Sequence, residues 1–337
     1  MSPGLFSTCG HRLPDSPPLS QMPDQNPLSI GVVILTHGRS QESVRLARSL
    51  LDDGIPADSI VIVQNPTGPD DPAIAPPDPG VVVRRAERNL GYASGMNEGI
   101  RHQLERGVDW VLLLTHEIRF HPGSLQALLE AARHADGYGM IGPALWWQER
   151  DQPLSFGGKR GDLSGIHHLQ ERPHTPPNGI AACDWIDGAA QLIRAELLEQ
   201  AGLLDERFFI YYEDVELCLR ASRAGWLVGV VPQALADASP GAASRPGAYA
   251  YLTSRNGLEY ARLAGGAKAL TTRLMRQCEH SVNLLREYRR ADEAGRARCR
   301  AALRGLWMGT LDFARRRWGP PPATLMGLGD LRNTQSS

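Results

Sequence analysis

The sequence is poor in lysine, in cysteine pairs and in long apolar runs, and each absence excludes a class of protein. Two of the 36 basic residues are lysines, and the net charge of −1 excludes a broadly basic nucleic-acid-binding protein. The five cysteines include no CxxC pair, which excludes a disulfide framework and a cysteine-based zinc site. No run approaches the roughly 18 apolar residues of a membrane span, and the N-terminus has no apolar region of the signal-peptide type. We expect a cytoplasmic protein, with peripheral contact at the inner membrane face as the alternative.

Common glycine motifs are missing from the glycine-rich segment 89–97, which has no GxGxxG and no GKS or GKT. This segment is therefore neither a dinucleotide-binding fingerprint nor a P-loop. The sequence as a whole has no GxSxG, which excludes a serine-hydrolase elbow.

The charge that is present is divided unevenly along the chain. Residues 265–337 carry 14 basic and 6 acidic side chains, net +8, so residues 1–264 carry a net −9. Hydrophobic residues make up 42% of the sequence, which is enough for a large core. The near-neutral total therefore describes an acidic body followed by a basic tail.

The order of apolar and polar segments predicts an α/β fold. Six prolines among polar residues in 1–28 predict a disordered leader. Beyond it, short β-branched runs alternate with amphipathic segments, which favours a Rossmann-like, mostly parallel sheet with helices on both faces. The expected strands are 30–36, 60–63, 81–84 and 111–114, and the expected helices begin near 40, 93 and 122. Residues 140–180 are predicted to be loop-rich, and 265–318 largely helical.

Polar residues that follow the predicted strands are the first candidates for a binding site, because ligands of such sheets bind at the carboxyl ends of strands. Gly91 lies in a glycine-rich segment that lets the backbone approach a ligand, and Asn89 and Asn97 offer amides there; a plain turn explains the same pattern. Glu117 follows another strand and suits a divalent cation that bridges a diphosphate, although a lone surface carboxylate is the alternative.

The strongest single feature is the adjacent pair Glu213 and Asp214 at a predicted helix start. The aromatic run before the pair gives one acid a partly desolvated setting, which raises its pKa toward that of a general base. The helix N-terminus favours the charged form instead. Ordinary capping by first-turn acids remains the alternative on position alone.

Taken in order, these segments resemble the family-2 glycosyltransferases of the GT-A fold, especially the rhamnosyltransferase-like bacterial branch. The matching stretches are VVILTHGR at 32–39, VIVQNPT at 61–67, NLGYASGMNEGI at 89–100, VLLLTHEIRFHPGSL at 111–125, the long block 185–226 that contains YYED, and YLTSRNGLEY at 251–260. The resemblance implies a GT-A domain over 29–264, a helical C-terminal extension over 265–320 and a flexible tail over 321–337.

The resemblance also implies a reaction. It implies inverting transfer of a hexosyl or deoxyhexosyl group from a UDP- or dTDP-sugar to a hydroxyl of a small-molecule, glycan or lipid-linked acceptor. Asp214 is the implied general base, with Glu213 as its neighbour. The implied donor-site residues are Thr36, Gln64 and Asn89 with Gly91 and Asn97 for the nucleotide, Gly188 and Ala189 beside the sugar, and Arg255 at the diphosphate.

The sequence departs from the family pattern at three positions. The second strand ends in Gln64 where an acid is usual, the metal motif is Thr115-His116-Glu117, and Ala238 stands where a late histidine is usual. Glu117 is therefore the expected ligand for Mg²⁺ or Mn²⁺, with His116 as a further candidate that suits Mn²⁺ better. Arginines that replace the metal in part are the alternative.

Two other functions compete with the transferase hypothesis. A non-catalytic sugar-nucleotide-binding protein with a degenerate metal site is the first, and retention of the Glu213–Asp214 pair argues against it. A nucleotidyltransferase is the second, and the lack of a lysine-containing glycine loop argues against it. The basic extension is expected to complete the acceptor site, to rest on anionic lipid, or to form salt bridges to the acidic body or to a second subunit.

Overall fold

The computed structural model describes residues 28–68, 70–161, 165–238 and 245–325. The expected leader, 1–28, therefore lies outside the described residues except for Leu28, which packs against the core. The strands are β1 (Ile30–His37), β2 (Ile60–Asn65), β3 (Val82–Arg85), β4 (Trp110–Thr115), β5 (Arg119–Phe120), β6 (Tyr138–Trp147), β7 (Gln152–Ser155), β8 (Gly158–Arg160), β9 (Ile166–His168), β10 (Ala181–Cys183), β11 (Ala190–Arg194) and β12 (Leu227–Asp237). The α-helices are α1 (Ser40–Asp52), α2 (Gly91–Glu105), α3 (Ser124–Arg133), α4 (Ala195–Ala201), α5 (Glu213–Arg223), α6 (Pro246–Arg290) and α7 (Glu293–Ala314).

One large sheet organises the body of the molecule, with strand order β10-β12-β6-β11-β4-β1-β2-β3. The β3-β2-β1-β4 half is parallel, as expected. In the other half, β11 runs antiparallel to both β4 and β6, so the sheet as a whole is mixed. The expected α/β class with a helical C-terminal part is confirmed, and the second half of the sheet combines the parallel β6–β12 pair with antiparallel pairs.

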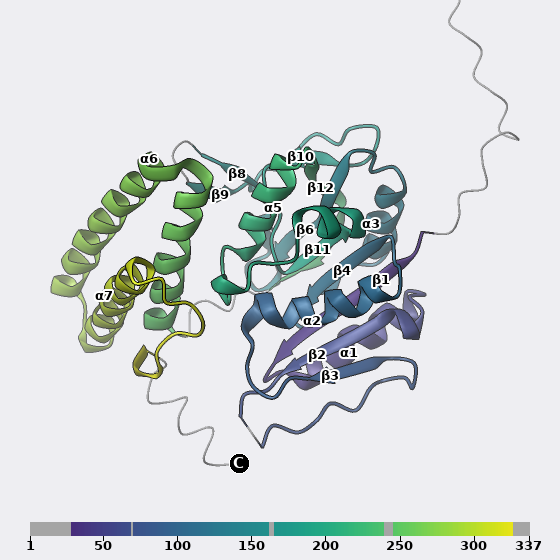
Figure 1. Ribbon diagram of the computed structural model, residues 1–337, viewed down its shortest axis with the longest axis horizontal. Helices are drawn as coiled ribbons and strands as arrows, with labels where there is room; N and C mark the ends of the chain where they lie inside the picture. The colour runs from purple at the N-terminus through teal and green to yellow at the C-terminus, as the bar shows by residue number, and fades with distance from the viewer. Residues whose placement is uncertain (1–27, 69, 162–164, 239–244, 326–337) are drawn as a thin grey trace, which may run out of the picture.

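Helices cover both faces of the sheet because alternate residues of its central strands are buried on opposite sides. Val32 and Ile34 of β1 pack with apolar residues of α1 and α3. Val33 and Leu35 pack with residues of α2, α4 and α5 on the other face, where Figure 1 shows α2 and α5. The nearly uniform burial of these strands explains why they were recognisable from their continuous apolar runs.

The segment 140–180 was expected to be loop-rich, and this expectation is wrong at its start. Strand β6 covers Tyr138–Trp147, and its first eight residues are buried. It pairs in parallel with β12 and antiparallel with β11 and β7. Glycines and a proline break the apolar pattern of β6, and partners that are distant in sequence supply the order.

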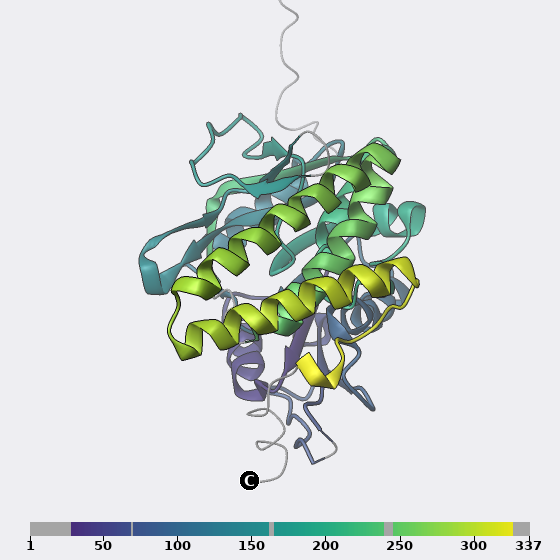
Figure 2. The same ribbon diagram turned by 90° about the vertical axis from the view of Figure 1, so that its left-hand side faces the viewer.

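The C-terminal part forms a helical unit beside the body (Figures 1 and 2). Helix α6 is broken at Gly265 and Gly266, which have non-helical backbone angles, so it has two arms. The first arm begins at Pro246, ahead of residue 265 where the extension was expected to begin. Helix α7 packs closely against the first arm: a Cβ at Gly305 would lie 2.0 Å from the carbonyl oxygen of Gly247. This close backbone approach requires glycine.

The region after the helices is partly ordered. Residues 321–325 were assigned to a flexible tail, but Leu325, in the short helical turn Ala323–Leu325, is buried against Tyr251 and Leu252. The rest of that tail, 326–337, lies outside the described residues. No helix in the described ranges is both long enough and apolar enough to cross a membrane.

Candidate active site

A cavity of about 780 Å³ lies between the sheet edge and the helical unit. The carboxyl ends of β1, β2 and β4 reach the same edge, because Thr36 pairs with Gln64 and Leu35 pairs with Thr115. The cavity itself is lined by residues that follow β4, by the loop before β11, by the start of α5 and by both arms of α6. Its size is in the usual range of small-molecule sites, about 300–1,000 Å³.

The acid pair lies at the N-terminus of α5 and faces this cavity. Asp214 accepts hydrogen bonds from the backbone N–H of Gly188 at 2.9 Å and of Val215 at 2.8 Å. Burial and the nearby charge of Asp187 nevertheless raise the pKa of Asp214 to about 7. Glu213 is almost fully buried, and burial together with the charge of Asp214 raises its pKa well above the usual value. Asp214 is thus a carboxyl that titrates near neutral pH.

The backbone before the pair is strained. Phe209, Tyr211 and Tyr212 have φ angles of 66°, 72° and 75°, in the left-handed region that non-glycine residues rarely adopt. Asn256 of α6 holds this segment, because its side-chain nitrogen donates to the carbonyl oxygens of Phe208, Ile210 and Tyr211 at 2.7–2.9 Å. Strain of this kind persists only where the surrounding structure fixes it, and it concentrates at functional sites.

The N-terminus of α2 fixes the same segment from the other side. The carbonyl oxygen of Phe209 accepts from the backbone N–H of Tyr92 at 2.6 Å and of Ala93 at 3.2 Å. Gly91 has a φ of 80°, and a Cβ there would lie 2.5 Å from Phe209. The Tyr92 hydroxyl donates to the carbonyl oxygen of Gly188, the residue whose N–H holds Asp214. The glycine-rich segment thus packs against the YYED segment and supports Asp214.

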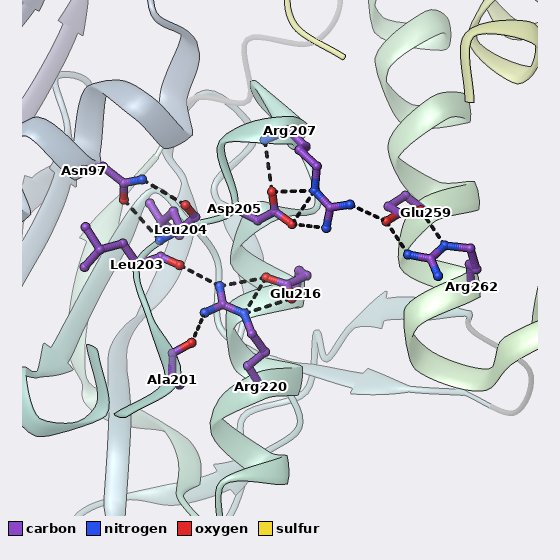
Figure 3. Close-up of polar contacts among 10 residues, drawn as sticks. All are labelled: Asn97, Ala201, Leu203, Leu204, Asp205, Arg207, Glu216, Arg220, Glu259 and Arg262. Carbon is purple, nitrogen blue, oxygen red and sulfur yellow. Dashed lines mark hydrogen bonds and ion pairs between the residues drawn. The ribbon is translucent and has the colours of Figure 1, made fainter. Parts of the chain in front are cut away.

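A polar network joins α2, α5 and α6 around the loop before the strained segment (Figure 3). Asn97 exchanges two hydrogen bonds with the backbone of Leu204. Arg220 pairs with Glu216 and donates to three backbone carbonyls of residues 201–203. Arg207 bridges Asp205 and Glu259. Asn97 therefore has a structural role here, and its assignment to the donor site stays a prediction.

Two further carboxylates, Glu117 and Asp187, line the cavity. Burial and the charge of Asp187 raise the pKa of Glu117 to about 7. The Nε2 of His116 lies 3.4 Å from the Oε2 of Glu117, and burial lowers the pKa of His116. The described residues contain no group of three or more histidine, cysteine, aspartate or glutamate side chains placed to hold a metal. Two carboxylates still fit Mg²⁺, which proteins often bind through one or two carboxylates, water and substrate phosphates.

Comparison with known proteins decides the family. The model of the family described as "Glycosyltransferase like family 2" matches residues 29–258. The chain belongs to this family. The expected membership is therefore confirmed.

Several curated relatives of this family-2 chain are glycosyltransferases. It is 32% identical over 182 residues to the N-acetylglucosaminyl-diphospho-decaprenol L-rhamnosyltransferase of Mycobacterium tuberculosis, covering 46% of this chain and 58% of the relative. It is 25% identical over 200 residues to the galactofuranosyltransferase GlfT1 of Mycolicibacterium smegmatis, covering 57% and 65%. It is 26% identical over 147 residues to the dTDP-rhamnosyl transferase RfbF of Shigella flexneri, covering 43% and 47%. The chain thus spans less than two thirds of the length of each of these relatives.

Among solved structures, the mannosyltransferase PcManGT from Pyrobaculum calidifontis, in complex with GDP-Man and Mn²⁺, has a TM-score of 0.48. It is 12% identical, and the match covers 86% of this chain and 88% of that one. GalNAc-T7 with UDP, GalNAc and Mn²⁺ has a TM-score of 0.49 at 13% identity, covering 70% and 50%.

The family-2 site differs from expectation at Gln64 and Arg255. Gln64 is buried, and its amide is used by the loop that follows β2: it donates to the Pro72 carbonyl at 2.7 Å and accepts from the Ile74 N–H at 3.2 Å. Arg255 is fully buried outside the cavity lining, where it donates to the carbonyl oxygens of Phe208 and Gly319. Both side chains already bind main chain in this structure, and their assignment to the donor site stays a prediction.

The other expected donor residues fall into two groups. Gly188 and Ala189 line the cavity beside Asp214. Thr36 and Asn89 lie outside its lining: Thr36 is buried with a hydroxyl that has no partner among the described residues, and Asn89 accepts from the Gly91 N–H at 2.9 Å. The sequence pattern did not single out Asp187 or Asn256, although both lie within the matching stretches, at 185–226 and 251–260.

Proposed function

We propose that this family-2 chain is an inverting glycosyltransferase that uses a nucleotide-diphosphate sugar, with Asp214 as the general base. The observation that carries the proposal is the setting of Asp214: it lines the cavity, two backbone N–H groups orient it, and its pKa is raised to about 7. A base with a pKa near the working pH combines a large deprotonated fraction with useful basicity.

The proposed reaction is a single displacement. The Asp214 carboxylate takes the proton of an acceptor hydroxyl, and the hydroxyl oxygen forms a bond to the anomeric carbon. The bond from that carbon to the diphosphate oxygen breaks, and the nucleoside diphosphate leaves with the electron pair. Gly188 and Ala189 are proposed to flank the sugar, and Thr36 and Asn89 to contact the nucleotide. One displacement at the anomeric carbon inverts its configuration.

Glu117 and Asp187 are proposed to hold Mg²⁺ or Mn²⁺, with His116 beside them. When bound, the cation would neutralise charge that develops on the leaving diphosphate. Burial and the charge of Asp187 raise the pKa of Glu117, and a bound cation would favour the charged form of both carboxylates. A UDP- or dTDP-sugar is the proposed donor class, and a relative is named a dTDP-rhamnosyl transferase. The proposed acceptor is a hydroxyl of a small molecule, a glycan or a lipid-linked sugar.

The test compares Asp214→Asn with the matched exposed variant Asp136→Asn in assays with UDP- and dTDP-sugars. We expect Asp214→Asn to lower turnover by a factor of about 10²–10⁴, the usual contribution of a general base. Binding of the nucleoside diphosphate, measured by calorimetry, should stay within about twofold. Normal turnover in Asp214→Asn would exclude it as the base. Nucleotide binding without turnover in the unsubstituted protein would favour the non-catalytic alternative. The small number of potential metal ligands in the cavity is the observation that supports this alternative.

We also propose that the protein is cytoplasmic and that its basic helical unit rests peripherally on anionic lipid at the inner membrane face. A homodimer through the same helices is the alternative. Exposed apolar residues on α6 and α7 support the lipid proposal: Met275 is 61% exposed, and Leu285 and Trp307 are 49% and 47% exposed. Arginines lie between them along the same helices. Apolar residues flanked by arginine are typical of helices that lie in a lipid interface.

A further inference from the structure

We propose that the second arm of α6 carries an anion-binding subsite for the acceptor, formed by Arg273, Arg276 and Gln277. The acceptor would then carry a phosphate or diphosphate group in addition to the hydroxyl that reacts. This inference rests on the proposed function, because it assigns a substrate class to the same cavity.

The position of these residues is the first observation. Four polar residues of this arm are separated by three, one and three positions, which brings them to one face of the helix: Arg273, Arg276, Gln277 and His280. All four line the cavity that also contains Asp214. The exposed apolar residues Met275 and Leu285 are not part of this lining, so the cavity face and the apolar face of the arm are distinct.

The second observation is that the polar atoms on this face lack partners. The Nε of Arg273 is buried and has no hydrogen-bond partner among the described residues, while its Nη2 donates to the Thr253 carbonyl at 3.2 Å. Gln277 is 5% exposed; its amide nitrogen donates to the Ser254 hydroxyl, and its Oε1 is buried without a partner. Buried polar atoms without partners are costly, and a ligand that pairs with them recovers this cost.

The arginines of the scaffold provide a contrast. Arg207, Arg220 and Arg262 each form an ion pair with a carboxylate at 2.6–2.8 Å (Figure 3). Within the part of the chain that the structure describes, Arg273 and Arg276 form no such pair. These three arginines are paired with carboxylates, whereas Arg273 contacts the Thr253 carbonyl and the Tyr212 ring and keeps its Nε without a partner among the described residues.

The charge distribution in the cavity indicates how the acceptor would lie. The wall that contains Glu117, Asp187 and Asp214 repels an anion unless a cation is present, so an anionic acceptor group would avoid it. The opposite wall carries two guanidinium groups. Guanidinium groups bind phosphate oxygens through parallel N–H donors, and a neutral hydroxyl would lie toward Asp214.

The first experiment measures binding of inorganic pyrophosphate to the full chain by calorimetry, with Mg²⁺ and saturating UDP or dTDP so that the donor site is filled. We expect binding in the unsubstituted protein, a loss of about tenfold or more in Arg276→Ala, as for one charge-assisted hydrogen bond, and a partial loss in Arg276→Lys. Arg289→Ala, on the same arm but outside the cavity lining, should bind normally. Arg276 is exposed, its guanidinium lies beside Gly165, and it forms no ion pair among the described residues, so these variants should remain folded.

Equal affinity for pyrophosphate in Arg276→Ala and the unsubstituted protein, or no binding in either, would overturn the subsite.

The second experiment compares three glycosyl acceptors that share one sugar: its prenyl diphosphate, its 1-phosphate and its methyl glycoside. Arg276→Ala should raise the KM for the two phosphorylated acceptors and leave the methyl glycoside unchanged; a greater effect on the prenyl diphosphate would assign a lipid source. If Asp214→Asn keeps full turnover while pyrophosphate binding depends on Arg276, the proposed base fails and the subsite stands.

Discussion

Asp214 is subject to opposing effects that set its pKa. Hydrogen bonds from the Gly188 and Val215 N–H groups favour the carboxylate, whereas burial and the charge of Asp187 favour the protonated acid and together raise the pKa to about 7. The sequence predicted a raised pKa at this pair from its aromatic surroundings. It did not predict Asp187 as one cause, because that residue lies 27 positions earlier in the chain.

The raised pKa leads to a prediction for the pH dependence of turnover. Only the deprotonated carboxylate accepts a proton, so kcat/KM with saturating cation should rise tenfold per pH unit below about 7 and level off above it. A pH–rate profile from pH 5 to 9 measures this. A flat profile across pH 6–8 would contradict Asp214 as the titrating base.

The same shift predicts a change in stability with pH. Because the folded pKa of Asp214 is above the ordinary value of 3.8, the folded state binds the proton more tightly than the unfolded state does. The stability that this proton contributes is lost as pH rises from about 4 to about 7. Asparagine carries no charge, so Asp214→Asn should raise Tm at pH 8 more than at pH 4. Calorimetry at both pH values measures the difference, with each 1 kcal/mol worth about 2–4 °C in domains of about 150–250 residues. Asp136→Asn should show no such dependence.

Individual site residues were predictable only where local chemistry decides their role. Asp214 begins a helix after an aromatic run, and both features are visible in the sequence. Gln64 and Arg255 follow the family pattern equally well, but their partners are the 72–74 loop and the carbonyls of Phe208 and Gly319. Contacts between segments that far apart cannot be read from spacing, so the sequence did not predict these main-chain partners.

At the scale of elements, the strained segment 209–212 depends on one side chain of another helix. Asn256 donates to the carbonyls of Ile210 and Tyr211 in this segment and of Phe208 just before it, and α2 donates to the carbonyl of Phe209. The sequence predicted a helix that begins near Glu213, and α5 begins there. It did not predict that the residues before it would be left-handed, because aromatic residues rarely adopt that conformation.

This dependence predicts that Asn256→Asp lowers both the stability and the turnover of the protein. The substitution keeps the shape but replaces the donor nitrogen with a carboxylate oxygen that faces carbonyl oxygens. We expect a stability loss of about 2–4 kcal/mol, as for other buried groups left without a partner, and a lower kcat because Asp214 is displaced. Denaturant unfolding and kinetics measure the two effects.

Asn283→Asp, an exposed position on the same helix, is the matched control and should change neither quantity. Normal kcat in Asn256→Asp that remains folded would show that the strained segment does not need Asn256 to position the acid.

At the scale of the whole molecule, the near-zero net charge is the sum of two parts of opposite sign. Near the junction, Arg262 is paired with Glu259 of its own helix at 2.7 Å, and Arg207 of the body is paired with the same carboxylate. Others lie on the cavity wall, and others again lie on the outer surface beside exposed apolar residues. The sequence predicted the asymmetry and a helical form for this region. It could not assign each arginine to one of these surroundings, because that depends on which face of α6 meets the body.

The outer surface leads to the last prediction, which concerns lipid. Met275, Val282 and Leu285 are spaced so that they share one side of α6, and Arg286, Arg289 and Arg290 are close to them in the helix. We expect the full chain to co-sediment with phosphatidylglycerol vesicles at low salt and to be released as salt screens the arginines, with little binding to phosphatidylcholine. Leu285→Glu should weaken this binding because it places a like charge against the anionic surface. Asn283→Asp, which adds a charge without removing an apolar side chain, separates the apolar contribution from the electrostatic one. Equal sedimentation with both lipids, or a dimer in solution that Leu285→Glu dissociates, would show instead that the apolar face contacts protein.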